Sequence, residues 1–225
     1  MNLVYTDKVN FIKKKINEYK SKGLQIFTSS SFQSHSIPLL DILNKVDPGI
    51  PIYFLNTGFH FPETLEYKDE IASLLNLNVI ELESSQPKIS QKDANGRFLF
   101  SSNPSYCCYI NKILPLEPIL IEKDVWIAGV RKTQNSNRAS FNFEEEGKFN
   151  TLRFHPILDW SDRLIWKYIK DHKLPKHPLH NKGYVSIGCE PCTQKFENVD
   201  AEVRDGRWAG MKKTECGLHV DLIKK

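Results

Sequence analysis

Five cysteines are the residues of this chain with most chemical potential, and their spacing divides them into two groups. Cys107 and Cys108 are adjacent, Cys189 and Cys192 form a CxxC pair, and Cys216 stands alone near the end of the 225-residue sequence. Thiolates bind soft metal ions and iron–sulfur clusters, and a single activated thiolate can act as a nucleophile. Four thiols plus one therefore suggest a metal site and a separate reactive thiol.

The four paired cysteines favour a cluster over a single ion. A CxxC pair places two sulfurs on one turn, whereas neighbouring side chains diverge by about 100° on a helix and about 180° on a strand. A multi-iron cluster offers several corners and so accepts both arrangements. A tetrahedral zinc site is the first competing interpretation, and buried cysteines without a metal are the second.

The lone cysteine belongs to the run ECGLH, in which Gly217 follows Cys216 and His219 ends the run. A thiol beside glycine near a chain end can move into and out of a site. A nearby imidazole or basic group would lower its pKa and populate the thiolate. An exposed cysteine without a function explains the same run.

Basic residues gather late in the sequence and could bind an anion. In RDGRW, Arg204 and Arg207 lie three residues apart beside Trp208. Guanidinium groups bind phosphate or sulfate oxygens bidentately, although an ordinary solvated surface has the same composition. Further basic residues are Arg131, Lys132, Arg138, Lys212 and Lys213.

Composition limits the class of protein. A chain of 225 residues with 40% hydrophobic content fits one α/β domain with an appended segment. No apolar run approaches the roughly 18 to 20 residues of a membrane helix, and the charged N-terminus does not resemble a signal peptide. A net charge of +4 is too small to argue for nucleic acid. We therefore expect a cytoplasmic protein that binds neither membranes nor nucleic acid.

The apolar pattern predicts the elements that position these residues. Val9, Ile12, Ile16 and Tyr19 recur at helical spacing, and Gly23 is placed to end that helix. Short apolar runs then alternate with helices, which predicts a parallel sheet with right-handed crossovers. The expected strands are 24–28, 52–55, 77–82 and 125–130. The expected helices include Ile37 to Leu43, a helix beginning at Pro62, residues 107–114, and Leu164 to Ile169 capped by Ser161.

The remaining segments are expected to be irregular. Residues 132–149 are polar and predict a loop, and after His172 the helical periodicity fades. Ligands of open parallel sheets bind beyond the carboxyl ends of the strands. Two loops fall there: Ser29 to Gln33, rich in hydroxyl groups, and Asn56 to Phe61, where Gly58 permits a turn that a β-carbon hinders. Ordinary turn residues are the alternative interpretation.

Together, these motifs resemble the assimilatory adenylyl-sulfate and phosphoadenylyl-sulfate reductase family. The matching stretches occur in the family's order and span residues 24 to 219, and IGCEPCT with ECGLH is highly specific. The double cysteine and the CxxC pair resemble the cluster-containing branch. The stretches are SSSFQ (29–33), LNTGFHFPET (55–64), CCYINKILPLE (107–117), GVRKTQNSNR (129–138), YVSIGCEPCT (184–193), RDGRWAG (204–210) and KTECGLH (213–219).

The resemblance implies a fold and a set of site residues. The fold would be α/β, with a Rossmann-like parallel sheet of the adenine nucleotide alpha hydrolase (PP-loop) type and a mobile C-terminal tail. Residues 1–172 would form the nucleotide-binding domain, and residues 173–225 the cluster-binding and catalytic segment. The implied 4Fe-4S ligands are Cys107, Cys108, Cys189 and Cys192, and the implied catalytic residues are Cys216 and His219. The implied substrate-binding residues are Ser29, Ser30, Ser31, Phe32, Thr57, Gly58, Lys112, Arg131, Arg204 and Arg207.

The implied activity is that of an oxidoreductase of sulfate assimilation and cysteine biosynthesis. It would reduce adenosine 5'-phosphosulfate to sulfite and AMP through a Cys216 thiosulfonate, with thioredoxin or glutaredoxin as partner. The sequence allows a homo-oligomer. It departs from the family at Phe32-Gln33-Ser34-His35, at Asn56 where Asp is usual, and after Gly206-Arg207-Trp208, where the family's aromatic cluster is reduced to the tryptophan.

Three alternatives remain at this point. The first two departures touch nucleotide recognition, so the 3'-phosphorylated substrate, alone or as well, is the nearest alternative. An adenylating pyrophosphatase of the same loop class would need a Gly-Gly pair and an Asp, and SSSFQSHS has neither. A metal-cluster redox sensor without catalysis would leave Cys216 without a role.

Overall fold

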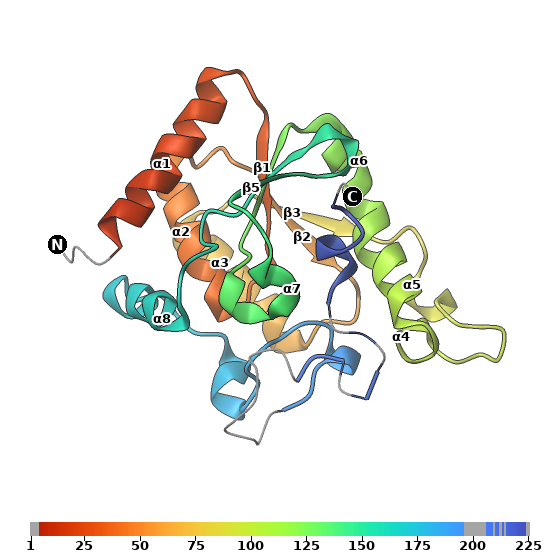
Figure 1. Cartoon of the computed structure of the whole chain (residues 1–225). Helices are drawn as coiled ribbons and strands as arrows, with labels where there is room; N and C mark the ends of the chain where they lie inside the picture. The colour runs from red at the N-terminus through yellow and green to blue at the C-terminus, as the bar shows by residue number, and fades with distance from the viewer. Residues whose placement is uncertain (1–4, 196–205, 209, 212, 214, 224–225) are drawn as a thin grey trace.

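The computed structural model describes residues 5–195, 206–208, 210–211, 213 and 215–223. Its strands form one sheet in the order β3-β2-β1-β4-β6-β5 (Figure 1). All neighbouring strands are parallel except the edge pair β5 and β6. The strands are β1 Ile26–Ser29, β2 Ile52–Asn56, β3 Val79–Glu83, β4 Val125–Ala128, β5 Glu144–Glu146 and β6 Leu152–Phe154.

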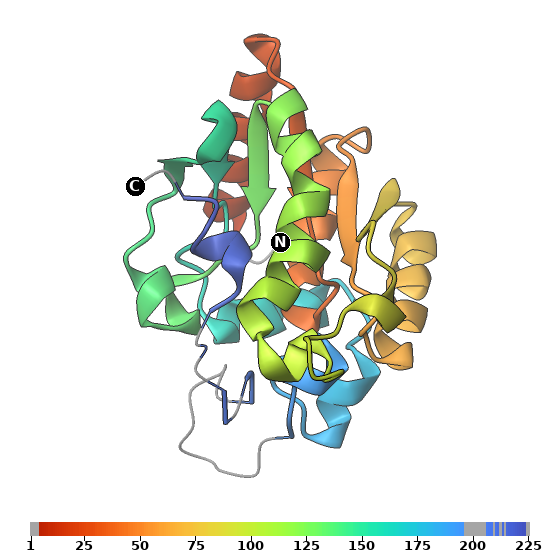
Figure 2. The ribbon, with the colours of Figure 1, turned by 90° about the vertical axis from the view of Figure 1, so that its right-hand side faces the viewer.

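Helices cover both faces of the sheet (Figures 1 and 2). One apolar layer lies between the sheet and helices α1 Thr6–Ser21, α2 Ile37–Val46, α3 Pro62–Leu75 and α8 Asp162–Asp171. The other face packs against α6 Leu114–Glu122 and the C-terminal segment, through Leu116, Leu120 and Leu222. The short helices are α4 Leu99–Ser102, α5 Pro104–Cys108 and α7 Ser136–Ala139. The predicted α/β fold with a parallel sheet is confirmed.

Chain order places a switch point between β1 and β4. The chain runs from β1 outward to β2 and β3, and then returns to β4 on the other side of β1. Ser29 and Ala128 pair at the carboxyl ends of these two strands. Loops that leave neighbouring strands in opposite directions open a crevice between them, which is where ligands of such sheets bind.

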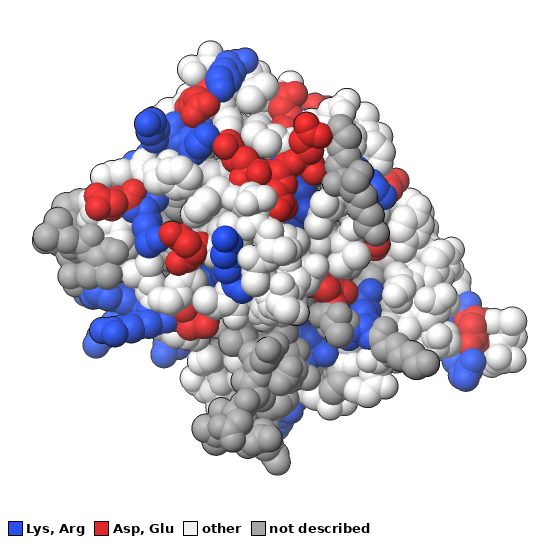
Figure 3. All heavy atoms as spheres, viewed as in Figure 1, with Lys and Arg blue, Asp and Glu red and all other residues white. Residues whose placement is uncertain are grey.

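The predicted loop at 132–149 is wrong. It contains the helix α7, which Asn135 caps by accepting a hydrogen bond from the Arg138 backbone, and the edge strand β5. This strand consists of three consecutive glutamates, so it has no hydrophobic pattern that would predict a strand. Charged side chains are typical of edge strands, where they prevent pairing with another chain. On the face in Figure 3, acidic and basic side chains are interspersed.

The helix expected at 107–114 is interrupted by a π-helical turn, Tyr109–Ile113. Asn111 lies in this turn and donates a hydrogen bond to the carbonyl of Cys107 at 2.9 Å. The extra residue in the turn shifts the register between α5, which carries both adjacent cysteines, and α6. Such π-turns occur often at functional sites.

The described residues near the C-terminus pack against the domain. Leu222 is 1% exposed, and its carbonyl accepts a hydrogen bond from the Lys148 backbone at 3.1 Å. A β-carbon on Gly217 would lie 2.8 Å from the Ile113 side chain, so only glycine lets this turn approach the π-turn so closely. Movement of this segment stays a prediction. No helix in the described part of the chain is long and apolar enough to span a bilayer.

Candidate active site

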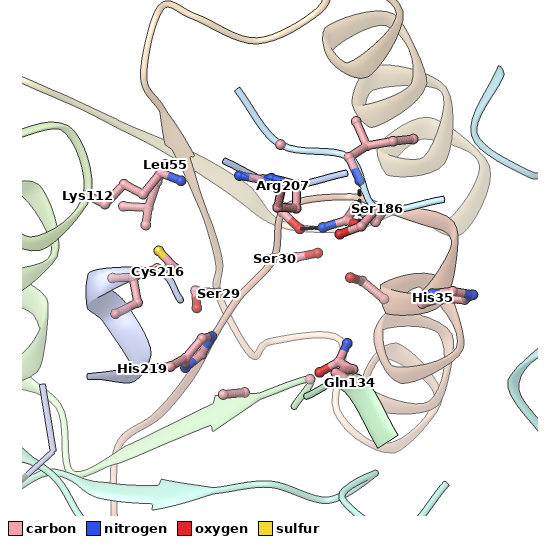
Figure 4. Close-up of a pocket in the computed structure, with 18 of the residues that line it drawn as sticks. Ser29, Ser30, His35, Leu55, Lys112, Gln134, Ser186, Arg207, Cys216 and His219 are labelled. Atoms are coloured by element: carbon pink, nitrogen blue, oxygen red, sulfur yellow. Dashed lines mark hydrogen bonds between the residues drawn. The ribbon is translucent and has the colours of Figure 1, made fainter. Parts of the chain in front are cut away.

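One cavity of about 150 Å³ opens at the carboxyl ends of β1 and β4 (Figure 4). The serine loop forms one wall, and residues 185–188 face it. Cys216 and His219 approach from the C-terminal segment. Lining residues that the sequence predicted are Ser29, Ser30, Ser31, Lys112, Arg207, Cys216 and His219. The structure therefore gathers residues that are up to 190 positions apart in the sequence around one space.

The serine loop is anchored by the residue that follows it. Phe32 adopts a left-handed backbone conformation with φ of 51°, is fully buried, and packs edge-on against Phe54. Its backbone N–H donates to Ser30 Oγ at 3.1 Å, while Ser29 Oγ accepts from Trp126 Nε1 at 2.9 Å. Phe32 thus anchors the loop in the core and is not part of the cavity wall, whereas Ser29, Ser30 and Ser31 line the cavity.

Gln33 joins the two walls of the cavity. Its side-chain amide donates to Ser31 Oγ at 3.2 Å, and its side-chain carbonyl accepts from the Ile187 backbone at 2.9 Å. The departure from the family pattern at this position therefore ties the serine loop to the segment that leads into Cys189.

Asn56 faces the neighbouring strand. Its side-chain amide donates to Glu81 at 2.8 Å and to Glu83 at 3.0 Å, both on β3. Its side-chain oxygen accepts from the backbone of Gly58, which has φ of 70°. Asn56 and Gly58 are absent from the wall of the cavity at the carboxyl ends of β1 and β4. The Asn56 amide therefore supplies hydrogen-bond donors to two neighbouring carboxylates.

The four paired cysteines line a second, smaller cavity with Thr57, Asn111 and Lys112. Thr57 Oγ1 lies 3.2 Å from Cys189 Sγ, and the Phe59 carbonyl accepts from the Glu190 backbone at 2.7 Å. These contacts bring the CxxC pair to the loop after β2, so Thr57 belongs to the cysteine site.

Burial and the neighbouring cysteines oppose ionisation of Cys107 and Cys192. Burial, followed by the neighbouring cysteines, raises the pKa of Cys107 to about 12. Burial and Cys189 also raise the pKa of Cys192, to about 11. A bound metal cation would lower these pKa values again, because its positive charge stabilises the thiolate form. Among the described residues, no group of three or more His, Cys, Asp or Glu side chains could hold a single metal ion. A cube of iron and sulfur is larger than one ion, so its thiolate ligands lie further apart than those of a single ion. Four converging thiols are a donor set that suits such a cluster.

Lys112 lines both cavities, so its positive charge lies close to the cysteine site and to Cys216. Burial alone would lower the pKa of Lys112, but the thiols of Cys189, Cys216 and Cys108 raise it above its usual range. The ammonium group therefore stays charged between the cysteine site and the lone thiol.

The guanidinium groups have different partners. Arg207 packs against the backbone of Gly188, where a β-carbon would collide with it, and donates to the Cys192 carbonyl at 3.3 Å. Arg131 is fully buried, pairs with Asp162 at 2.7 Å, and is not part of the cavity wall. Arg204 lies outside the described residues.

Cys216 is 8% exposed, and its position is set by Glu215. The Cys216 backbone donates to the Glu215 carboxylate at 2.7 Å, which also accepts from Asn135 at 2.9 Å and from Arg138. Sequence reasoning missed the contacts of Glu215, although an acid directly before the candidate nucleophile was the available signal.

His219 sits on a surface made by two strands. Its ring stacks nearly parallel to Trp126, with 6.2 Å between centroids, and its Nδ1 lies 3.2 Å from Arg153 Nη2. Arg153 was not predicted as a site residue. It stands between apolar residues of a short strand, and no motif in the sequence marks it.

Comparison with known proteins identifies the family. Residues 25–195 match the phosphoadenosine phosphosulfate reductase domain. The adenosine 5'-phosphosulfate reductase of Bacillus cereus strain Q1 is 41% identical over 207 residues, covering 90% of this chain and 86% of the relative. That of Bacillus velezensis is 40% identical over 203 residues, covering 89% and 87%.

Solved structures share the fold at lower identity. A phosphoadenylyl-sulfate reductase from Candida auris superposes with a TM-score of 0.66 at 19% identity, covering 84% of this chain and 97% of that one. The NH3-dependent NAD synthetase of Campylobacter jejuni gives a TM-score of 0.53 at 15% identity, covering 75% and 71%. These neighbours confirm the predicted adenine nucleotide alpha hydrolase (PP-loop) type of fold. With its motifs in order around one cavity and relatives at about 40% identity, this chain belongs to the phosphoadenosine phosphosulfate reductase domain family.

Proposed function

We propose that this chain reduces adenosine 5'-phosphosulfate to sulfite and AMP, in the assimilation of sulfate. The observation that carries the proposal is the meeting of Cys216 with Lys112 and Arg207 on the cavity at the β1–β4 switch point. A thiol beside two cations suits attack on an anionic sulfonyl group. Curated relatives named adenosine 5'-phosphosulfate reductase support the same substrate.

The first step is transfer of the sulfonyl group to the enzyme. The Cys216 thiolate attacks the sulfur of the phosphosulfate, the bond from sulfur to the bridging oxygen breaks, and AMP leaves with that electron pair. Cys216 becomes a thiosulfonate. Lys112 and Arg207 would stabilise the charge that develops on the phosphate oxygens and on the sulfonyl oxygens.

The second step is reduction by an external dithiol such as thioredoxin or glutaredoxin. One thiolate of the partner attacks Cys216 Sγ and releases sulfite, which leaves a mixed disulfide. The partner's second thiol resolves this disulfide and restores the Cys216 thiol. Both electrons come from the dithiol. Because Cys216 is 8% exposed in this structure, the step requires the C-terminal segment to move outward.

We further propose that Cys107, Cys108, Cys189 and Cys192 hold a 4Fe-4S cluster. When bound, this cluster would order the site and shape its electric field rather than carry the electrons. The chain's own part is supplied by Asn111, which donates toward Cys107 Sγ at 3.6 Å, and by Lys112, which lies between the cysteine site and Cys216.

Charge balance favours adenosine 5'-phosphosulfate over its 3'-phosphorylated form. Within the described part of the cavity wall, Lys112 and Arg207 form no ion pair with a described carboxylate, whereas Arg138 is paired with Glu215. These two cations of the described wall match the two negative charges of a phosphosulfate. A 3'-phosphate would add about 1.5 to 2 further negative charges.

A reductant-coupled assay with each substrate tests the proposal. Anaerobically purified protein should release sulfite and AMP from adenosine 5'-phosphosulfate when thioredoxin is supplied. The 3'-phosphorylated substrate should give a kcat/KM at least about tenfold lower, which corresponds to about 1.4 kcal/mol. Equal or reversed preference would contradict the substrate assignment, and nucleotide binding without sulfite release would favour a sensor.

A further inference from the structure

Arg153 is a charged residue in the middle of the sheet. It lies on β6, in register with Trp126 on β4 and Glu145 on β5, and none of its surface is exposed. Its Nε and Nη1 groups have no hydrogen-bond partner among the described residues. Glu145 is an ion-pair partner of Arg153, but at 3.9 Å it lies beyond hydrogen-bond distance. Burying a guanidinium is costly when its donors are left without hydrogen bonds, so this position calls for a functional explanation.

The guanidinium lies against aromatic rings and reaches one polar atom of the catalytic segment. It lies 5.1 Å from the Trp126 ring and 5.4 Å from the Phe141 ring, as cation–π contacts. Its Nη2 lies 3.2 Å from His219 Nδ1. Trp126 fixes the plane of the His219 ring by stacking, and Arg153 fixes which edge of the ring faces the sheet.

The chemistry of this contact determines the proton on His219. Arginine has donors and no acceptor, so a hydrogen bond from Arg153 requires a lone pair on His219 Nδ1. The single proton of the neutral ring then resides on Nε2. Burial lowers the pKa of Arg153 to about 10, which still leaves it charged at neutral pH.

We propose that Arg153 is a positioning residue that holds His219 in the Nε2-protonated tautomer. Through Arg153, His219 offers the cavity a hydrogen-bond donor instead of a proton acceptor. This inference rests on the proposed function, in which a donor on the cavity that Cys216 also lines would stabilise the negative charge of the reacting groups.

Other charged groups near Arg153 supply a matched control. Glu145 Oε2 lies 3.9 Å from Arg153 Nη1 and 4.0 Å from His155 Nδ1. Its other carboxylate oxygen accepts from the Asn142 backbone at 2.9 Å, a bond that glutamine can keep. The change Glu145→Gln therefore alters the charge around Arg153 without touching the Arg153–His219 contact.

Nitrogen NMR of the histidine rings in the anaerobic, cluster-loaded enzyme tests the proposal, with His219 assigned by its loss in His219→Gln. In the wild-type protein and in Glu145→Gln, Nδ1 should be unprotonated and Nε2 protonated. Arg153→Met, which keeps the length of the side chain but removes its donors, should lose this single tautomer. It should also slow formation of the Cys216 thiosulfonate by about 10- to 100-fold, as for other partners that orient a histidine.

The wild-type spectrum alone can overturn the proposal, even if Arg153→Met fails to fold. A proton on Nδ1 in the wild-type enzyme would refute it, and so would an unchanged tautomer in Arg153→Met. The spectra are recorded without substrate. If the wild-type enzyme releases no sulfite, the proposed function is wrong. The tautomer assignment is tested independently by the spectra.

Discussion

Arg138 donates two hydrogen bonds to the carboxylate of Glu215, at 2.7 and 3.0 Å, and Glu215 directly precedes Cys216, the proposed nucleophile. The two side chains are 6% and 4% exposed. A buried, bidentate pair of this kind is geometrically demanding, and removing one partner leaves the other charge uncompensated. The pair therefore fixes the position of the nucleophile through its neighbour in the chain.

Replacing Glu215 by glutamine should release the segment that carries Cys216. The change leaves Arg138 buried without its counter-charge, a loss of about 3 to 5 kcal/mol if the segment cannot relax. We expect slower sulfite release and faster alkylation of Cys216 by iodoacetamide, measured by mass spectrometry of the C-terminal peptide. Asp159→Asn removes an exposed ion pair with Lys8 and should change neither rate. Slower alkylation of Glu215→Gln than of the wild type would contradict this role.

Replacing Cys216 by serine should abolish sulfite formation but preserve nucleotide binding and the visible spectrum. The reason is that a serine hydroxyl is far less nucleophilic than a thiolate at neutral pH. Stopping the wild-type enzyme before reductant is added should reveal the mass of SO3 on the peptide that contains Cys216. That mass on another peptide would refute the assignment.

Replacing Cys189 by serine should remove the brown colour and lower the melting temperature, because a bound cluster stabilises only the folded state. Iron and sulfide analysis with a visible spectrum measures the loss. Zinc instead of iron in a colourless wild-type protein would contradict the cluster assignment. The Cys216→Ser protein is the matched control, since it changes one thiol outside the proposed ligand set.

Replacing Asn56 by aspartate should destabilise this chain. The new carboxylate would face Glu81 and Glu83, where the Asn56 amide now donates to both. Like charges on neighbouring strands cost about 0.2 to 1 kcal/mol, and loss of the two hydrogen bonds adds to that cost. Urea unfolding should show the loss, and high salt should reduce it. The double change Asn56→Asp with Glu83→Gln should recover part of the stability.

His177 should make the folded state sensitive to acid. It is fully buried, its Nδ1 accepts from the Leu179 backbone at 3.2 Å, and its Nε2 lies 3.0 Å from Thr64 Oγ1. Burial lowers the pKa of His177 to about 4, whereas an unfolded histidine has a pKa of about 6.5. The folded state therefore binds fewer protons. The contribution of His177 to the free energy of unfolding is therefore fully present above about pH 6.5 and is lost as the pH falls toward 4.

Urea unfolding at pH 7.5, 6 and 5 measures this dependence. The full effect is at most about 3 kcal/mol for a shift of this size. Buried His155 contributes in the same direction, so the difference between wild type and His177→Gln isolates one residue. Parallel pH curves for the two proteins would show that His177 does not carry the effect.

The sequence predicted the parts of the site that carry a recognisable type and spacing. The cysteines and the serine loop, which line cavities in the structure, were predicted as site residues because their residue types and spacings are typical of sites for metals or anions. The central strands β1, β2 and β4 were found because they are buried on both faces, which leaves an uninterrupted run such as Ile52 to Leu55. Their bounds differ from the expected ones by up to two residues, as is usual at strand ends.

The residues that were missed depend on contacts between distant segments. The carboxylate of Glu215 meets Arg138 across 77 positions, and His219 meets Arg153 across 66. No local pattern encodes such a pairing. The edge strand of Glu144–Glu146 was missed for a different reason, since its pairing with β6 comes from the backbone and its side chains are polar.

The packing of Leu222 has a consequence for how the enzyme rests between turnovers. Leu222 is held in the apolar layer on one side of Cys216, and the Glu215 carboxylate is held on the other. The segment that carries the Cys216 thiol is therefore anchored on both sides, by Glu215 at its start and by Leu222 near its end. In the proposed second step the reductant reaches Cys216 only after one of these two anchors has opened, so we expect the opening of this short segment to limit the rate of that step.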